Sequence, residues 1–407
     1  MNKLFALICI GASTACGNQP EAGARAATAG AHAGSSVNIY ANTGANEFAP
    51  EAARALPRVY VPNSRSGTVT VIDPRTYQVV RTFATGKVPQ HVVPSYDLKT
   101  LWVANNSSGT LTPIDPTTGI EGKPVPVDDP YNLYFTPDGK YAMVIAEALQ
   151  RIDFRDPQTM KLVQSLHVVC KGLDHMEFTA DNAYAIATCE FSGQVVKIDL
   201  ATRTVAGYLT LDPASWTNVV PPPIARIFGR KRYRTTGMAA LMRVPSMPQD
   251  IRSSADGSKF YVADMKKNGV FVVDPVKFER IDFIHTGVGT HGIYPSRDGK
   301  YLYVTNRGWT TLAAGRHGPG SISVLDPATD SIVANWPIPG GGSPDMGNVT
   351  ADGKELWVSG RYDDEVYVFD TQTGKLTHRI PVGREPHGLT VWPQPGRYSL
   401  GHTGNMR

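Results

Sequence analysis

The 407-residue sequence predicts an all-β fold, a seven-bladed β-propeller. Its 39 glycines and 31 prolines exceed the average for globular proteins, which favours short strands joined by tight turns. A repeat of about 42 residues has the length of a four-stranded propeller blade. In each repeat an aspartate ends a strand-like run and starts a turn, at Asp73, Asp115, Asp156, Asp199, Asp274, Asp326 and Asp370.

Two of the repeats are longer than the others and predict insertions, at about residues 212–247 and 308–320. The ends of the array predict how the ring closes. Residues 57–87 provide only three strands of a first blade, and residues 387–393 have the pattern of its missing innermost strand. A C-terminal strand that completes blade 1 would remove the open edges of the array.

Tyr303-Val304-Thr305-Asn306 is the motif of the YVTN β-propeller repeat proteins, which the chain resembles over about residues 57–395. Variants of the motif stand at Tyr60-Val61-Pro62-Asn63, Trp102-Val103-Ala104-Asn105, Tyr261-Val262-Ala263-Asp264 and Trp357-Val358-Ser359-Gly360. The resemblance implies the propeller fold. It implies no activity, because this fold supports many unrelated functions.

The N-terminus predicts export. Lys3 precedes the apolar residues 4–12, and the small residues Ser13-Thr14-Ala15 follow, so residues 1–15 are expected to be a signal peptide. Cys16 comes next and could carry a lipid; an ordinary signal peptide is the alternative. Residues 16–56 are expected to be a flexible tether, and residues 396–407 a C-terminal tail. The protein would be periplasmic, anchored to the outer membrane or extracellular, with no transmembrane span.

The first residues of the innermost strands should converge on the axis of the ring, and each blade has His, Asp or Asn there. Neutral imidazole is a ligand for Cu, Fe and Zn. We therefore expect one transition-metal ion bound by His91, His175, His291 and His387, with Asn132, Asp250 and Asp345 as further ligands or orienting groups. The alternative is a metal-free polar channel, because the four histidines differ by one residue in register, which would turn a strand side chain to the opposite face.

Further features are predicted on the same side of the ring. Arg230 and Arg232 belong to the long, basic insertion, which would be a lid for an anionic small ligand or a docking site for an acidic partner protein. A solvated loop is the alternative. Cys170 and Cys189 are expected to form a disulfide, the alternative being two free thiols.

Several functions are excluded or ranked by these observations. A net charge of +4 is too small to indicate nucleic acid binding, and no CxxCH, Gly-x-Ser-x-Gly or Walker motif occurs. The favoured hypothesis is small-ligand or metal binding at the mouth of the channel, in the form of a metal-dependent oxidoreductase without an assigned catalytic residue. A non-catalytic scaffold for protein binding is the alternative, and a lactonase-type hydrolase is a weaker one.

Overall fold

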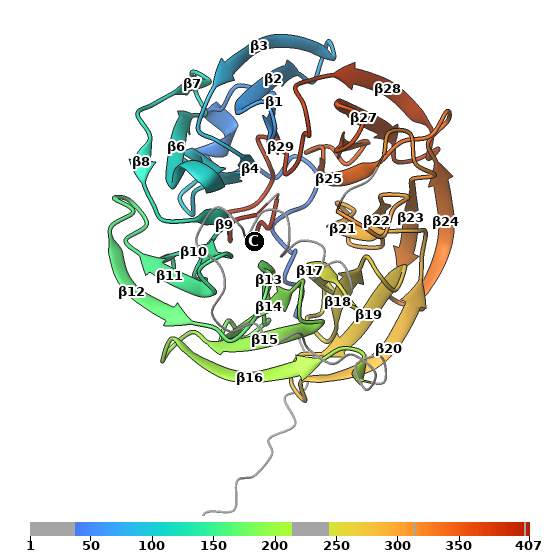
Figure 1. Cartoon of the computed structure of the whole chain (residues 1–407). Coiled ribbons are helices and arrows are strands. Elements are labelled where there is room, and N and C mark those ends of the chain that lie inside the picture. Colours follow the sequence, from blue (N-terminus) through green and yellow to red (C-terminus); the bar gives the residue numbers. More distant parts are fainter. Residues whose placement is uncertain (1–36, 214–243, 313–314, 403) are drawn as a thin grey trace, which may run out of the picture. The chain divides into compact units, whose positions relative to one another are not determined.

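Seven antiparallel sheets surround a common axis in the computed structural model (Figure 1). The structure describes residues 37–213, 244–312, 315–402 and 404–407. The predicted signal peptide, Cys16, Arg230 and Arg232 lie outside these residues. The prediction of an all-β, seven-bladed propeller is confirmed.

The blades follow each other in chain order, and blades 2 to 7 each have their first strand nearest the axis (Figure 1). Blade 2 contains β4(Pro89–Pro94), β5(Leu101–Asn105), β6(Thr110–Asp115), β7(Ile120–Glu121) and β8(Val125–Pro126). Blade 3 contains β9(Pro130–Phe135), β10(Ala142–Ala146), β11(Arg151–Arg155) and β12(Leu162–His167). Blade 4 contains β13(Leu173–Phe178), β14(Tyr184–Cys189), β15(Gln194–Asp199) and β16(Thr204–Thr210).

The remaining blades repeat this plan. Blade 5 contains β17(Pro248–Ser253), β18(Phe260–Asp264), β19(Gly269–Asp274) and β20(Glu279–His285). Blade 6 contains β21(Thr290–Pro295), β22(Leu302–Asn306), β23(Ser321–Asp326) and β24(Ser331–Pro337). Blade 7 contains β25(Pro344–Val349), β26(Glu355–Gly360), β27(Glu365–Asp370) and β28(Leu376–Pro381). Two short 3-10 helices are η1(Ala52–Arg54) and η2(Asn106–Ser108).

Blade 1 is completed by a strand from the other end of the chain, as predicted. β29(Thr390–Trp392) pairs with β1(Arg58–Asn63), and Val391 lies opposite Val59. β2(Thr68–Asp73) and β3(Gln78–Ala84) follow outward. This pairing joins the two ends of the array, so neither presents an open inner edge.

The repeated aspartates form turns because their side chains accept hydrogen bonds from the backbone two or three residues later. Asp73 accepts from the N–H of Arg75 at 3.0 Å, and Asp115 from the N–H of Thr117 at 2.8 Å. The inner strands between these turns are buried on both faces, because neighbouring blades pack face to face. The outermost strands alternate instead; in β24 exposed residues alternate with partly buried ones.

Residues 37–56 were predicted to belong to the flexible tether, and this is wrong. The N–H of Ile39 donates to the carbonyl of Ala255 at 2.8 Å, and the hydroxyl of Tyr40 donates to the carbonyl of Ser253 at 3.1 Å. Phe48 and Ala52 pack in the same apolar cluster as Trp392. These apolar side chains gain more from burial than the segment loses in conformational freedom.

Residues 396–407, predicted to be a plain tail, also pack against the propeller. The side chains of Leu400 and Met406 are buried in two different apolar clusters. No helix in the part of the chain that the structure describes has the length and apolar character needed to cross a bilayer.

Candidate metal centre

Five inner strands carry the same β-bulge close to their first residue. In β4, Pro89 lies opposite Asn105 and Val92 opposite Val103, so three steps on the inner strand match two on its neighbour. The same shift occurs in β13, β17, β21 and β25. At a bulge of this kind the inner strand has one extra residue. The side chains of its two bulged residues therefore do not alternate regularly between the two faces of the sheet.

These bulges explain how histidines in different registers reach one place. His91 and His175 are the second of the two bulged residues in their strands, whereas His291 is the first in its strand. All three have 2% or less of their surface exposed. His387 lies just before β29, with its N–H donating to the carbonyl of Pro62 at 3.0 Å, and is also buried.

The structure brings the four predicted histidines together. The ring centroid of His91 lies 5.5 Å from that of His175 and 4.8 Å from that of His387. His291 completes the group, at 6.4 Å from His175 and 6.0 Å from His387. We call these four residues, together with His402, the axial histidine cluster.

His402 was not predicted, because it belongs to the supposed tail. Its ring centroid lies 4.3 Å from that of His175 and 5.0 Å from that of His91, and its side chain is fully buried. The dipeptide Gly401-His402 was the available signal. It lies among three glycines in a segment with no run of charges, which is unusual for a solvated tail.

Asp345 orients one side of the cluster. Its Oδ2 lies 2.5 Å from Nδ1 of His387, and its Oδ1 accepts a hydrogen bond from Nε of Arg307 at 2.5 Å. Burial alone would raise the pKa of this carboxyl group. The positive charge of Arg307 and the imidazoles of His291 and His387 outweigh burial and hold the pKa of Asp345 well below its usual value.

Asn132 and Asp250 lie on the other side of the cluster. The side-chain amide nitrogen of Asn132 is 3.1 Å from Nδ1 of His175 and 3.2 Å from Nδ1 of His402. Asp250 accepts hydrogen bonds from the N–H groups of Ile251 and Ile293, and burial raises its pKa to about 6. Both residues therefore contact the cluster or its strands, as the sequence suggested.

Several imidazole nitrogens in the cluster lack hydrogen bonds. Among the described residues, neither nitrogen of His91 has a partner, nor does Nε2 of His387. Nε2 of His175 and Nδ1 of His291 make no hydrogen bond, but each lies near a carboxylate oxygen, Oδ1 of Asp174 at 3.1 Å and Oδ1 of Asp345 at 3.3 Å. Burial is the main reason why the pKa of His91 is lowered well below its ordinary value and that of His387 to about 4. These imidazoles are neutral at neutral pH, and neutral imidazole is the form that binds metals.

A pocket of about 330 Å³ opens beside the cluster and includes His291 in its wall. Its wall also contains two acids and two arginines: Glu147, Glu190, Arg307 and Arg361. Burial raises the pKa of Glu147 to about 8 and that of Glu190 to about 7. We call this space the mouth pocket.

The sequence reasoning missed these four charged residues. Each directly follows the second strand of its blade: β10, β14, β22 and β26 end at Ala146, Cys189, Asn306 and Gly360. Because the second strand ends on the side where the first begins, the next side chain can face the mouth. The position after the second strand of a blade was therefore the signal, and for Arg307 and Arg361 this is the position after a YVTN-like motif.

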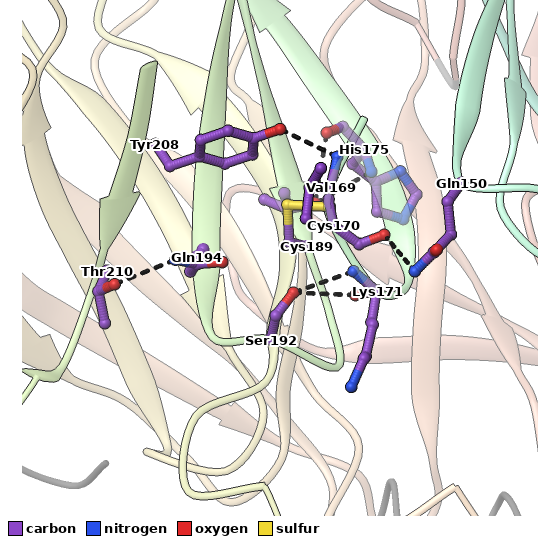
Figure 2. The surroundings of a disulfide bond; sticks show 11 residues. Gln150, Val169, Cys170, Lys171, His175, Cys189, Ser192, Gln194, Tyr208 and Thr210 are labelled. Atoms are coloured by element: carbon purple, nitrogen blue, oxygen red, sulfur yellow. Dashed lines mark hydrogen bonds between the residues drawn. A yellow bond between two sulfur atoms is a disulfide. The ribbon is translucent and has the colours of Figure 1, made fainter. Parts of the chain in front are cut away.

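The structure joins Cys170 and Cys189 by a disulfide, shown in Figure 2 with His175 nearby. Cys170 precedes β13 and Cys189 ends β14, so the bond ties the start of the strand that carries His175 to its neighbour. The carbonyl of Cys170 also accepts a hydrogen bond from Nε2 of Gln150 at 3.1 Å (Figure 2).

The predicted shorter insertion contributes Leu312 to the mouth pocket, and the carbonyl of Leu312 accepts a hydrogen bond from the hydroxyl of Tyr362.

Comparison with protein families gives a match over most of the chain. A model described as "YNCE-like beta-propeller" matches residues 23–213 and 236–395. No curated protein matches the sequence.

Comparison with solved structures gives distant matches. Hydrazine synthase from Kuenenia stuttgartiensis is 17% identical, with a TM-score of 0.56 over 73% of this chain and 87% of that one. Dihydro-heme d1 dehydrogenase NirN, solved in complex with DHE, is 14% identical, with a TM-score of 0.56 over 82% of this chain and 75% of that one. A protein described as a candidate 6-phosphogluconolactonase from Bacteroides uniformis is 18% identical, with a TM-score of 0.58 over 82% and 98%. At these identities the likeness establishes the fold alone.

Proposed function

Because the chain belongs to the YNCE-like beta-propeller family, whose fold assigns no reaction by itself, we propose that its function resides in the axial histidine cluster, which binds a transition-metal ion. Copper, iron and zinc are the ions that this set of imidazole donors suits. A small ligand would reach the ion through the mouth pocket. Redox chemistry on that ligand, as in a metal-dependent oxidoreductase, is the activity we propose for a copper or iron form.

The observation that carries this proposal is the state of the imidazoles. A buried polar nitrogen without a hydrogen bond costs about 1–3 kcal/mol, so the three such nitrogens on the neighbouring rings of His91 and His387 are unfavourable unless something binds them. His387 supports the same interpretation: its Nδ1 is held by Asp345, and its Nε2 faces no partner among the described residues. A carboxylate on one imidazole nitrogen is the usual arrangement that orients the other nitrogen toward a metal.

Metal analysis tests the proposal. The purified full chain is incubated separately with Cu²⁺, Fe²⁺ under anaerobic conditions, and Zn²⁺, then desalted and analysed by mass spectrometry for bound metal. We expect about one equivalent of one of these ions. The double substitution His91→Gln and His175→Gln should remove it, whereas His285→Gln, an exposed histidine on β20, should not. Circular dichroism checks that the variants fold.

The scaffold hypothesis predicts a different result. If the folded wild-type chain retains none of the three ions, the metal proposal is wrong, and the cluster is a polar core of a binding protein. The mouth pocket would then be the surface available to a small ligand or partner.

We also propose that the protein is exported. The motif at residues 1–15 and a disulfide outside any recognised redox motif both favour an oxidising compartment. Fractionation of cells that produce the full chain tests this: recovery in the cytosol at full length would contradict it. A shift of the Cys16→Ser variant from the membrane to the soluble exported fraction would support lipid attachment.

A further inference from the structure

The C-terminal segment lies inside the ring, and Figure 1 places the C-terminus at the centre of the propeller. Gly401 pairs with Tyr134 of β9, and the N–H of His402 donates to the carbonyl of Leu133 at 3.1 Å. The N–H of Phe135 donates to the carbonyl of Leu400 at 3.0 Å. Residues 400–402 therefore continue the sheet of blade 3 toward the axis, and this places the side chain of His402 in the cluster.

A buried ion pair fastens the segment beyond His402. Nη2 of Arg407 lies 2.6 Å from Oε1 of Glu177, and the side-chain amide of Asn405 donates to the same oxygen at 3.3 Å. Glu177 is fully buried, and the guanidinium of Arg407 also packs over the ring of Tyr40 at 5.2 Å. The pair is formed between β13 and the C-terminal segment, so it positions that segment against blade 4.

His402 completes a set of three possible ligands. Among the described residues, His175, Asp250 and His402 are the group whose ligand atoms all lie within 4.8 Å of one another. The three residues come from blade 4, blade 5 and the C-terminal segment, and all are buried. Asn132 contacts Nδ1 of both histidines, which fixes the orientation of the two rings.

We infer that the metal position lies between His175, Asp250 and His402, and that binding of the ion and docking of residues 396–407 stabilise each other. This inference rests on the proposed function. Two imidazoles and one carboxylate are a donor set of catalytic zinc sites and of non-haem iron(II) sites. An ion that binds a ligand from the propeller and a ligand from the C-terminal segment favours the docked state of that segment, and the coupling is reciprocal.

Arg407 acts in this scheme as a positioning residue. Its guanidinium lies beside Glu177, and the hydrogen bonds and ion pair shown for it involve none of the three ligands. Its substitution should weaken metal binding through the position of His402. A purely structural role would change the stability of the protein in the same way with and without metal.

Hydrogen exchange tests the inference in the full chain. Backbone exchange of residues 397–407 is followed with and without Zn²⁺, and Zn²⁺ affinity is measured by competition with a chelator. In the wild type we expect Zn²⁺ to slow this exchange about tenfold or more. The His402→Gln substitution should abolish that effect and weaken Zn²⁺ binding about 100-fold or more, since loss of a residue that only orients a ligand already costs about 10- to 100-fold.

The position of Arg407 is tested in parallel. Arg407→Ala should speed exchange of the segment without Zn²⁺ and weaken Zn²⁺ binding, and Arg407→Lys should restore part of both. His285→Gln, on an exposed outer strand, is the matched histidine control and should behave like the wild type.

The outcomes separate this inference from the proposed function. If His402→Gln binds Zn²⁺ as tightly as the wild type, and Zn²⁺ does not change exchange of the segment, the inference is overturned. Loss of Zn²⁺ in the His91→Gln and His175→Gln variant would in that case leave the proposed function intact. If the folded wild type binds none of the three ions, both are wrong.

Discussion

Asp345 and His387 form the closest polar contact described in the axial cluster, with 2.5 Å between Oδ2 and Nδ1. The same carboxylate pairs with Arg307 through both Nε and Nη2, each at 2.5 Å from Oδ1. One buried acid therefore balances an arginine and fixes the ring of a histidine. Both the stability of the ring and the direction of Nε2 of His387 depend on it.

Asp345→Asn is expected to lower the free energy of unfolding by about 3–5 kcal/mol, because it leaves the buried Arg307 without a counter-charge. Urea unfolding followed by fluorescence measures the change. Asp298→Asn is the control, since its pair with Lys300 at 3.4 Å is exposed and should matter by less than about 1 kcal/mol. Equal effects of the two substitutions would contradict the role given to Asp345.

Glu190→Gln is expected to change how stability depends on pH. Burial raises the pKa of Glu190 from 4.5 to about 7, so the folded state keeps a proton that the unfolded state releases. This contribution is fully present below pH 4.5 and is lost as pH rises to about 7. When unfolding is measured from pH 4 to 8, the free energy of unfolding of the wild type should fall by about 2–3 kcal/mol relative to that of the variant as the pH rises.

The neutral side chain of the Glu190→Gln variant can still accept the hydrogen bond that Gln249 donates at 3.0 Å. The comparison therefore isolates the charge. A constant difference between variant and wild type from pH 4 to 8 would show that folding does not raise the pKa of Glu190.

The double substitution Cys170→Ser and Cys189→Ser is expected to cost about 3 kcal/mol, because the disulfide closes a chain segment with a sequence separation of 19. Thermal unfolding with and without reductant measures this. The wild type should lose stability in reductant, and the double variant should not respond. A wild type that is indifferent to reductant would mean that the two thiols are not joined.

Gly401→Ala tests whether the C-terminal segment needs its close approach to blade 3. Gly401 has φ of +105°, and an added Cβ would lie 2.4 Å from the carbonyl oxygen of Leu133. We expect a loss of about 1–3 kcal/mol, since neither the backbone angle nor the neighbouring strand can adapt cheaply. Gly207→Ala on β16 is the control, because the nearest atom to its added Cβ is 3.7 Å away. Similar stabilities for both variants would contradict this packing.

Much of the fold was predictable because it is periodic. The repeated aspartates mark one turn in each blade, and residues 387–393 were predicted as the strand that became β29(Thr390–Trp392). The propeller architecture also indicated that the first residues of the inner strands converge on the axis. It could not show that a bulge in five of these strands lets His91 and His291 point to one place from different registers.

The rest of the site required contacts that no local pattern encodes. Residues 37–56 and 396–407 have the composition of linkers, yet Tyr40 and Arg407 meet at the buried Glu177. His402 could be placed only by knowing that its segment pairs with β9. Long-range packing of this kind depends on the whole ring, and the repeat supplies no information about segments outside it.

The pairing of β29 with β1 also fixes the order in which the protein can be completed during synthesis. The inner edge of β1 stays unpaired while the other six blades are synthesised, because β29 is translated after them. The cluster gains His402 later still, so uptake of an ion at the proposed position must follow synthesis of residue 402. A chain cut short by a premature stop codon before residue 390 would keep an unpaired edge and should aggregate.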